Sequence, residues 1–152
     1  MGDPRWLSER EMRAWMGFRR MRLLLGLRLQ RDLGSQSGLS EADYDVLSSL
    51  SSAEDGRMRL SDLARHMRWS PSRLSHHVSR MHERGLVDRE ATADDGRGSM
   101  LVLTDLGAAT ITAAAPGHVA SVREHFIDLL TSDEIDAFAD LTERIVQRLE
   151  ES

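Results

Sequence analysis

The chain has 152 residues, a length that fits one domain large enough to bury a core without disulfides or structural metal ions. It contains no cysteine, which excludes disulfide bonds, thiolate metal sites and thiol-based redox sensing. No apolar run reaches the roughly 18 residues that would span a bilayer, and Met1 to Arg13 is too polar for a secretory signal. These features predict a cytoplasmic protein with no membrane partner.

The formal net charge of −5 would by itself argue against a nucleic-acid partner, but the charge is unevenly distributed. Between residues 57 and 97, nine arginines stand against six acidic residues, whereas residues 98–152 carry three arginines and ten acidic residues. Arginine suits phosphate and guanine, although a coding bias is the simpler explanation for the complete absence of lysine. The positive charge is therefore concentrated in the central third of the chain, which also holds four of the six histidines.

The N-terminal segment predicts a long helix, with Ser8 and Glu11 spaced as a capping box. From Met21 to Leu29 the apolar residues cover most of the helix circumference, which is more than one partner face can bury. This density favours a helix that lies between its own domain and a second subunit, with a central core helix as the open alternative. Residues 34–38, Gly-Ser-Gln-Ser-Gly, predict a flexible loop after it.

A second helix is predicted to begin after Ser40, the N-cap residue, and to bury one apolar stripe. The stripe consists of Tyr44, Leu47 and Leu50. A turn at residues 55–56 leads to a short strand at residues 57–60, after which Ser61 is expected to cap a brief helix. That helix would bury Leu63, Ala64 and Met67.

The next helix begins with Ser70 as N-cap and Pro71 at the first helical position, and Gly85 provides its left-handed stop. Its apolar face consists of Leu74, Val78 and Met81, with His82 close by as a packed, hydrogen-bonded side chain. Its polar face consists of Ser72, Arg73, His76, Ser79, Arg80, Glu83 and Arg84. A short helix, a tight turn and this longer helix constitute a helix-turn-helix, whose second helix enters the major groove of DNA. An ordinary amphipathic surface helix is the alternative.

Two strand-like runs, at residues 86–90 and 99–103, predict a hairpin directly behind this helix. Its loop carries a projecting Arg97, a side chain suited to the narrow and electronegative minor groove. A solvated turn is the alternative.

Two more helices are predicted in the C-terminal third. Thr104 and Asp105 cap an alanine-rich helix, which Pro116 is expected to kink or stop because proline lacks an N–H. Residues 131–134 form a capping box for the last helix. Its apolar stripe, Ile135, Phe138, Leu141, Thr142, Ile145 and Leu149, is expected to complete a dimer interface.

Three sequence blocks resemble those of the MarR family of winged helix-turn-helix bacterial transcriptional regulators. They are residues 70–75 (Ser-Pro-Ser-Arg-Leu-Ser), residues 83–87 (Glu-Arg-Gly-Leu-Val), and residues 95–97 followed by residues 103–107. The resemblance implies a mainly α-helical fold with a small β hairpin, and a helical dimerisation lobe built from the N- and C-terminal helices. We therefore expect a single domain at 1–152, with a DNA-binding lobe at 40–106 and dimerisation helices at 5–34 and 107–150.

The resemblance also implies a regulator, in the simplest case a repressor, that binds double-stranded DNA as a homodimer on a pseudo-palindromic operator. Arg97 would enter the minor groove, steadied by Asp95, while the helix after Ser70 reads the major groove. The predicted DNA-binding residues are Ser70, Ser72, Arg73, Ser75, His76, His77, Arg80, Asp95 and Arg97. Among these, Arg73, His76 and Arg80 are the expected base readers.

In the family, a small aromatic or anionic effector binds between the two lobes. Trp15, Arg19 and Tyr44 could line such a pocket because they combine aromatic surface with one cation, and packing in the core or dimer is their alternative role. Some phenolic and urate-type relatives use an arginine early in the helix after the wing. Residues 104–118 contain none, so that ligand is not carried over.

No catalytic residue, cofactor or metal site is expected, because the chain has no nucleophile elbow, phosphate-binding glycine loop or His-Glu-x-x-His pair. Two alternative functions remain. His118 and His125, with Glu124 nearby, could share a helical face in a metal-responsive regulator. The basic helix could also bind an acidic protein instead of DNA, since the overall acidity weakens phosphate binding.

Overall fold

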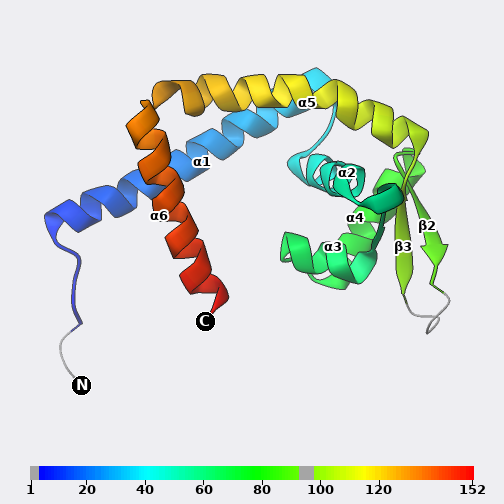
Figure 1. Ribbon diagram of the computed structural model, residues 1–152, viewed down its shortest axis with the longest axis horizontal. Coiled ribbons are helices and arrows are strands. Elements are labelled where there is room, and N and C mark those ends of the chain that lie inside the picture. The colour runs from blue at the N-terminus through cyan, green and yellow to red at the C-terminus, as the bar shows by residue number, and fades with distance from the viewer. Residues whose placement is uncertain (1–3, 93–97) are drawn as a thin grey trace. The chain divides into compact units, whose positions relative to one another are not determined.

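The computed structural model describes residues 4–92 and 98–152 (Figure 1). In chain order the elements are α1 (Glu9–Ser37), α2 (Glu41–Ser52), η1 (Glu54–Gly56), β1 (Arg57–Arg59), α3 (Leu60–Met67), α4 (Pro71–Glu83), β2 (Val87–Ala91), β3 (Ser99–Leu103), α5 (Asp105–His125), η2 (Ile127–Leu129) and α6 (Ser132–Glu150). The chain divides into two compact units. We call residues 30–118 the winged-helix unit, and residues up to 29 together with residues 119–152 the terminal unit.

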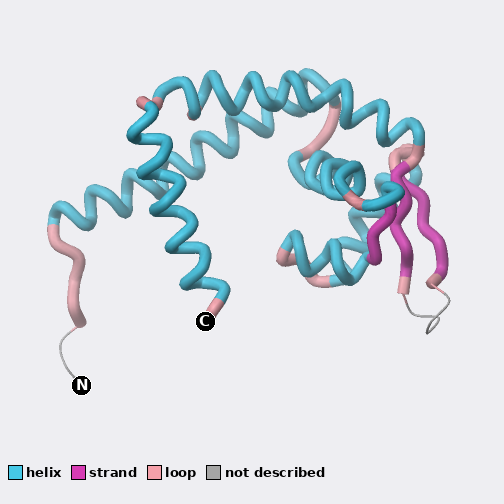
Figure 2. The backbone as a smooth tube through the Cα atoms, in the orientation of Figure 1, coloured by secondary structure: helices cyan, strands magenta, loops and turns pink. Residues whose placement is uncertain are grey.

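A small antiparallel sheet lies in the winged-helix unit, with the strand order β1-β3-β2 (Figure 2). The predicted hairpin of β2 and β3 is confirmed, and β1 adds a third strand along the free edge of β3. Leu101 stands at the centre of the register, since it pairs with Met58 on one side and with Arg89 on the other. The predicted fold class, mainly helical with a small β element, is therefore correct.

The core of the winged-helix unit gathers the apolar stripes of its helices against the sheet. Its most deeply buried members are Leu39, Val46, Leu47, Leu50, Leu63, Leu74, Val78, Met81, Val87 and Leu101. Leu74, Val78 and Met81 are the stripe predicted for α4, and all three have no exposed surface. Helical spacing alone placed these side chains correctly because one face of an amphipathic helix has to be buried.

Local hydrogen bonds fix the ends of the central helices as the sequence predicted. Ser40 and Asp43 form a reciprocal capping box at the start of α2, and Ser70 Oγ accepts from Arg73 N (3.2 Å) at the start of α4. Gly85 has the expected left-handed φ of 75° after α4. The turn between α3 and α4 places Arg68 at φ 57°, in a conformation that glycine adopts at lower cost.

Three predictions of where helices begin, end or break were wrong. Helix α1 continues through Gly34 to Ser37 and ends only at Gly38, which has a φ of 71°, because Ser37 Oγ donates to the carbonyl of Leu33 (2.7 Å) and Leu33 is buried. Ser61 does not cap α3. The helix begins two residues earlier than a cap at Ser61 would place it, at Leu60, because β1 leads directly into it through Arg59 without a side-chain cap.

The third wrong prediction concerns Pro116, which lies inside an uninterrupted α5. The carbonyl that loses its helical donor there belongs to Thr112, an exposed residue, so water can satisfy it. Packing also holds this turn in place, because a Cβ added at Gly117 would lie 2.3 Å from Gln36 Oε1. Tertiary contact therefore outweighs the local preference of proline for ending a helix.

The terminal unit contains the first part of α1, the end of α5, η2 and α6. Within it, Arg28 Nε lies 3.4 Å from His125 Nε2, and the rings of Phe126 and Phe138 meet edge to face at 5.3 Å. Both predicted caps are present, since Glu11 N donates to Ser8 Oγ and Glu134 N donates to Thr131 Oγ1.

Much apolar surface of the terminal unit remains exposed. It includes Trp15, Met16, Phe18, Leu23, Leu24, Leu27, Leu141, Ile145, Val146 and Leu149. Leu33 is the only buried residue of α1, and no residue of the fully described α6 is buried. The alternative of a central core helix at residues 21–29 is therefore wrong. None of the described helices is both long and apolar enough to cross a bilayer.

Candidate nucleic-acid interface

The face of α4 opposite the core carries most of the predicted DNA-binding side chains. Ser70, Ser72, Arg73, His76 and Arg80 are exposed, as the helical periodicity predicted. Two further predicted residues differ from these, since Ser75 is half-buried and His77 is buried. The structure thus brings together five exposed polar side chains, two of them arginines, on one short helix.

Arg73 does not extend freely from this face. Its guanidinium carbon lies 3.6 Å from the centroid of the Trp69 ring, a cation–π contact across the start of α4. The Trp69 ring in turn meets the His77 ring edge to face, with centroids 5.7 Å apart. Sequence reasoning missed Trp69, although an aromatic residue four positions before Arg73 was the available signal.

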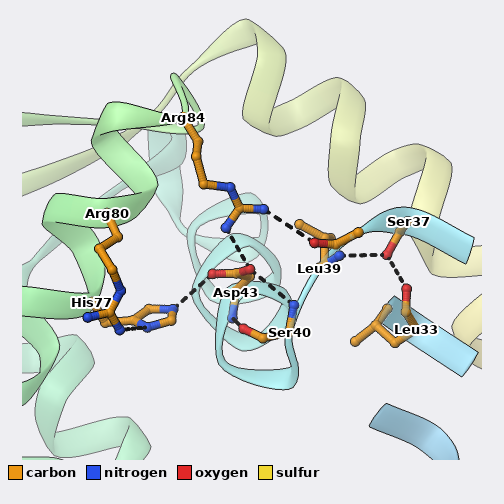
Figure 3. Close-up of polar contacts among 9 residues, drawn as sticks. Leu33, Ser37, Leu39, Ser40, Asp43, His77, Arg80 and Arg84 are labelled. Carbon is orange, nitrogen blue, oxygen red and sulfur yellow. Dashed lines mark hydrogen bonds and ion pairs between the residues drawn. The ribbon is translucent and has the colours of Figure 1, made fainter. Parts of the chain in front are cut away.

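Asp43 is the centre of a buried polar cluster that joins α2 to α4 (Figure 3). One of its carboxylate oxygens accepts from Ser40 N (3.0 Å) and from Arg84 Nη1 (2.8 Å). The other, Oδ1, lies 2.9 Å from His77 Nε2. Burial raises the pKa of Asp43, but its contacts with His77, Arg84 and the Ser40 backbone outweigh burial and hold that pKa well below its ordinary value. Asp43 is therefore a buried carboxylate that stays charged.

His77 turns inward toward this cluster and is buried. The structure therefore does not expose it for the DNA contact that the sequence predicted. Its Nδ1 lies 3.2 Å from Arg80 Nη2 (Figure 3), which connects the buried cluster to an exposed arginine. The sequence held a signal for this orientation. His77 follows Leu74 by three positions and precedes Val78 by one, which places it beside the apolar stripe.

Arg89 of β2 holds the hairpin against α4, a role that sequence reasoning missed. Its guanidinium donates to the carbonyl of Ser75 (3.3 Å) and to the hydroxyls of Ser75, Ser79 and Ser99 (3.1 to 3.2 Å). The predicted DNA contact Ser75 is thus already bonded to the hairpin. Arg59, Ser72, Ser75, Arg89 and Ser99 are among the residues that line a hollow beside the N-terminus of α4.

The remaining predicted nucleic-acid contacts, Asp95 and Arg97, lie outside the described residues. Their roles in the minor groove stay predictions. His82 is hydrogen-bonded as predicted, with Nδ1 3.0 Å from the carbonyl of Val87, but its side chain is about half exposed and not packed. The prediction of a packed His82 was therefore wrong, because its side chain is exposed and its Nδ1 lies 3.7 Å from Asp88 Oδ1.

The predicted effector residues are found on two helices. Trp15 and Arg19 are exposed on α1, where the Trp15 ring stacks on Phe18 at 5.9 Å, and the Tyr44 ring of α2 lies 4.4 Å from that of His118. Among residues 4–92 and 98–152, no group of three or more His, Cys, Asp and Glu side chains could hold a metal ion.

Comparison with known proteins identifies the family. A model of the MarR family matches residues 37–98, whereas curated protein sequences give no match. The solved structure of AbsC, a MarR family transcriptional regulator from Streptomyces coelicolor, is 42% identical, covers 98% of this chain and 100% of its own, and has a TM-score of 0.92. Sco3205, a MarR family transcriptional regulator from the same organism solved in complex with DNA, is 33% identical over 96% of this chain and 92% of its own, with a TM-score of 0.91. The fold of the winged-helix unit, the matching family model and these two relatives show that the chain belongs to the MarR family of transcriptional regulators.

Proposed function

We propose that the protein is a cytoplasmic transcriptional regulator that binds double-stranded DNA in a sequence-specific manner, as a homodimer on a pseudo-palindromic operator, and represses transcription. The observation that carries the proposal is the exposed face of α4, with Arg73 and Arg80, on a complete helix-turn-helix. The relative Sco3205, which was solved in complex with DNA, shares this fold over nearly the whole chain. The lobe boundaries expected from the sequence, 40–106 for DNA binding and 5–34 with 107–150 for dimerisation, remain part of the proposal.

The predicted residues other than Ser75 and His77 take roles that fit their positions. Arg73, His76 and Arg80 read base edges in the major groove, where arginine suits guanine. Ser70 and Ser72, at the positive end of the α4 dipole, bind the phosphate backbone, as does the adjoining hollow with its arginines. Asp95 and Arg97 act in the minor groove.

Homodimerisation is supported by the exposed apolar surface of the terminal unit. A single chain leaves the side chains of Leu23, Leu24, Ile145 and Leu149 largely in water, and a second copy would cover them. The two α4 helices of such a dimer would enter successive major grooves about 34 Å apart, one helical turn of DNA.

The test begins with selection of bound sequences from a randomised duplex library, followed by fluorescence anisotropy on the enriched duplex. We expect an inverted repeat, and an affinity that falls about a hundredfold or more between about 50 and about 200 mM salt as counterions are released. Arg80→Ala should reduce discrimination between operators, whereas Arg65→Ala, an exposed arginine of α3 paired with Asp62, serves as the matched control. Absence of binding at about 50 mM salt would refute the proposal and favour a protein-interaction module.

We also propose that an aromatic or anionic effector releases the DNA through Trp15, Arg19 and Tyr44, which combine aromatic surface with one cation. Benzoate is a suitable probe of this class. It should release DNA from the wild-type protein and act more weakly on Arg19→Gln. If benzoate and larger aromatic carboxylates leave DNA binding unchanged, effectors of this class are rejected.

A further inference from the structure

We propose that His77 is a positioning residue, which holds the guanidinium groups of Arg73 and Arg80 in the orientation that reads the operator without touching DNA itself. The inference rests on the proposed function, and it concerns the buried side of α4 instead of its exposed face. It would place part of the sequence specificity on a residue that is 9% exposed.

The anchor of this arrangement is Asp43. Its side chain is 5% exposed and is itself fixed by the capping box of α2 and by Arg84. The polar contact of 2.9 Å between Asp43 Oδ1 and His77 Nε2 therefore ties the imidazole to a rigid element of the core (Figure 3). A buried charge with this many partners strongly disfavours rotation of the ring away from it.

Two chains of contacts, which we call arms, start at His77, and the first runs to Arg80. A guanidinium can only donate, so the contact of 3.2 Å between Arg80 Nη2 and His77 Nδ1 requires Nδ1 to accept. In the neutral ring the proton then lies on Nε2, which faces the Asp43 carboxylate. This tautomer lets Nδ1 accept from Arg80 and leaves the Nε2 proton on the side of Asp43, so the ring holds an exposed arginine in one conformation.

The second arm runs from His77 through Trp69 to Arg73. The His77 ring meets the Trp69 ring at an interplanar angle of 85°, and Arg73 lies over the face of that indole. The imidazole therefore limits where the indole can lie, and the indole limits where the Arg73 guanidinium can lie. A single buried ring therefore contacts both Arg80 and Trp69.

His77→Gln is the variant that tests the inference. Its amide nitrogen can still reach Asp43, but it has neither the Nδ1 acceptor nor the aromatic edge. Arg84→Gln is the matched control, because it removes another side-chain partner of Asp43, and the Arg84 side chain bonds to Asp43 and to the Gly38 carbonyl instead of to the side chains of Arg80 or Trp69. The base pairs read by each arginine are first located with Arg73→Ala and Arg80→Ala.

The measurement is the affinity for the selected operator and for its single-base variants. We expect His77→Gln to lower discrimination at the base pairs of Arg73 and Arg80 by about fivefold or more, since a well-positioned arginine supplies at least that much. Its salt dependence should match the wild type. In the double variant with Arg80→Ala, the loss at the Arg80 base pair should be no larger than for Arg80→Ala alone. Arg84→Gln should lower the unfolding midpoint and leave discrimination unchanged.

The outcomes separate the two proposals. If the wild-type protein shows no sequence preference, the proposed function fails. If it shows one and His77→Gln discriminates as well as Arg84→Gln does, the positioning role is refuted. Trp69→Leu, which leaves Asp43 and His77 in place, tests the second arm even if His77→Gln does not fold. Unchanged discrimination at the Arg73 base pair would refute that arm.

Discussion

The winged-helix unit buries apolar side chains, whereas the terminal unit leaves most of its large apolar side chains exposed. All buried apolar side chains of the described residues lie between Leu33 and Ala114, within the winged-helix unit. Of the sixteen large apolar side chains that are exposed in the described chain, only Leu106 lies outside the terminal unit. The first unit is stabilised by burial within its own chain, whereas the second offers apolar surface that a partner could bury.

Polar contacts show the same contrast. In the winged-helix unit a buried carboxylate, Asp43, is shared by two helices. In the terminal unit the ion pair of Arg123 and Asp128 is more than half exposed at both ends, where water and salt weaken it. Substitutions should therefore have unequal effects on folding in the two units.

The largest expected effect is in the core. Leu101→Ala should lower the free energy of unfolding by about 4 kcal/mol, because it leaves a cavity at the centre of the sheet. Leu149→Ala, at an exposed position of α6, should cost less than about 1 kcal/mol in the monomer. Urea denaturation at low protein concentration measures both. Equal losses of unfolding free energy in the two variants would contradict the difference in burial between the two units.

Next in size is the buried carboxylate. Asp43→Asn should cost about 3 kcal/mol at pH 7, since His77 and Arg84 lose their charged partner. The pKa of Asp43 in the folded protein lies below its ordinary value of 3.8, so its contribution to the free energy of unfolding is complete above about pH 5 and is lost as the pH falls further. The difference in the free energy of unfolding between wild type and Asp43→Asn should therefore become smaller below that pH. A constant difference in urea titrations from pH 7 to acid conditions would contradict this interpretation.

Substitutions in the terminal unit should weaken dimer formation before they affect folding. Ile145→Arg should raise the dissociation constant of the dimer at least about tenfold, because it would bury an unpaired guanidinium in the interface. Gln147→Arg adds the same side chain on the opposite face of α6 and is the control. Sedimentation velocity over a range of concentrations measures the effect. A wild-type protein that stays monomeric would refute the dimer itself.

The smallest expected effect is at the surface of the terminal unit. Arg123→Ala should change the unfolding free energy by less than about 0.5 kcal/mol, because an exposed ion pair contributes little. Thermal unfolding at low and high salt provides the comparison. A loss above 1 kcal/mol that disappears at high salt would show that this pair is more important than its exposure indicates.

The sequence by itself determined what depends on near neighbours. The caps at Ser40, Ser70 and Thr131 join residues three positions apart, and the stripe of α4 follows from helical periodicity. The family blocks between residues 70 and 107 are local as well. These features were predicted correctly because the interacting residues are close together along the chain.

Only the tertiary structure decided the rest. Arg84 contacts Asp43 across 41 positions, Arg89 reaches Ser75 across 14, and Gly117 packs against Gln36. The local pattern placed His77 beside the apolar stripe of α4, but it did not indicate the buried Asp43 that the imidazole faces or the packing that keeps α5 unbroken. The physical reason is that local propensities differ by about 1 kcal/mol or less for most residues, so packing and buried charge decide wherever distant segments meet.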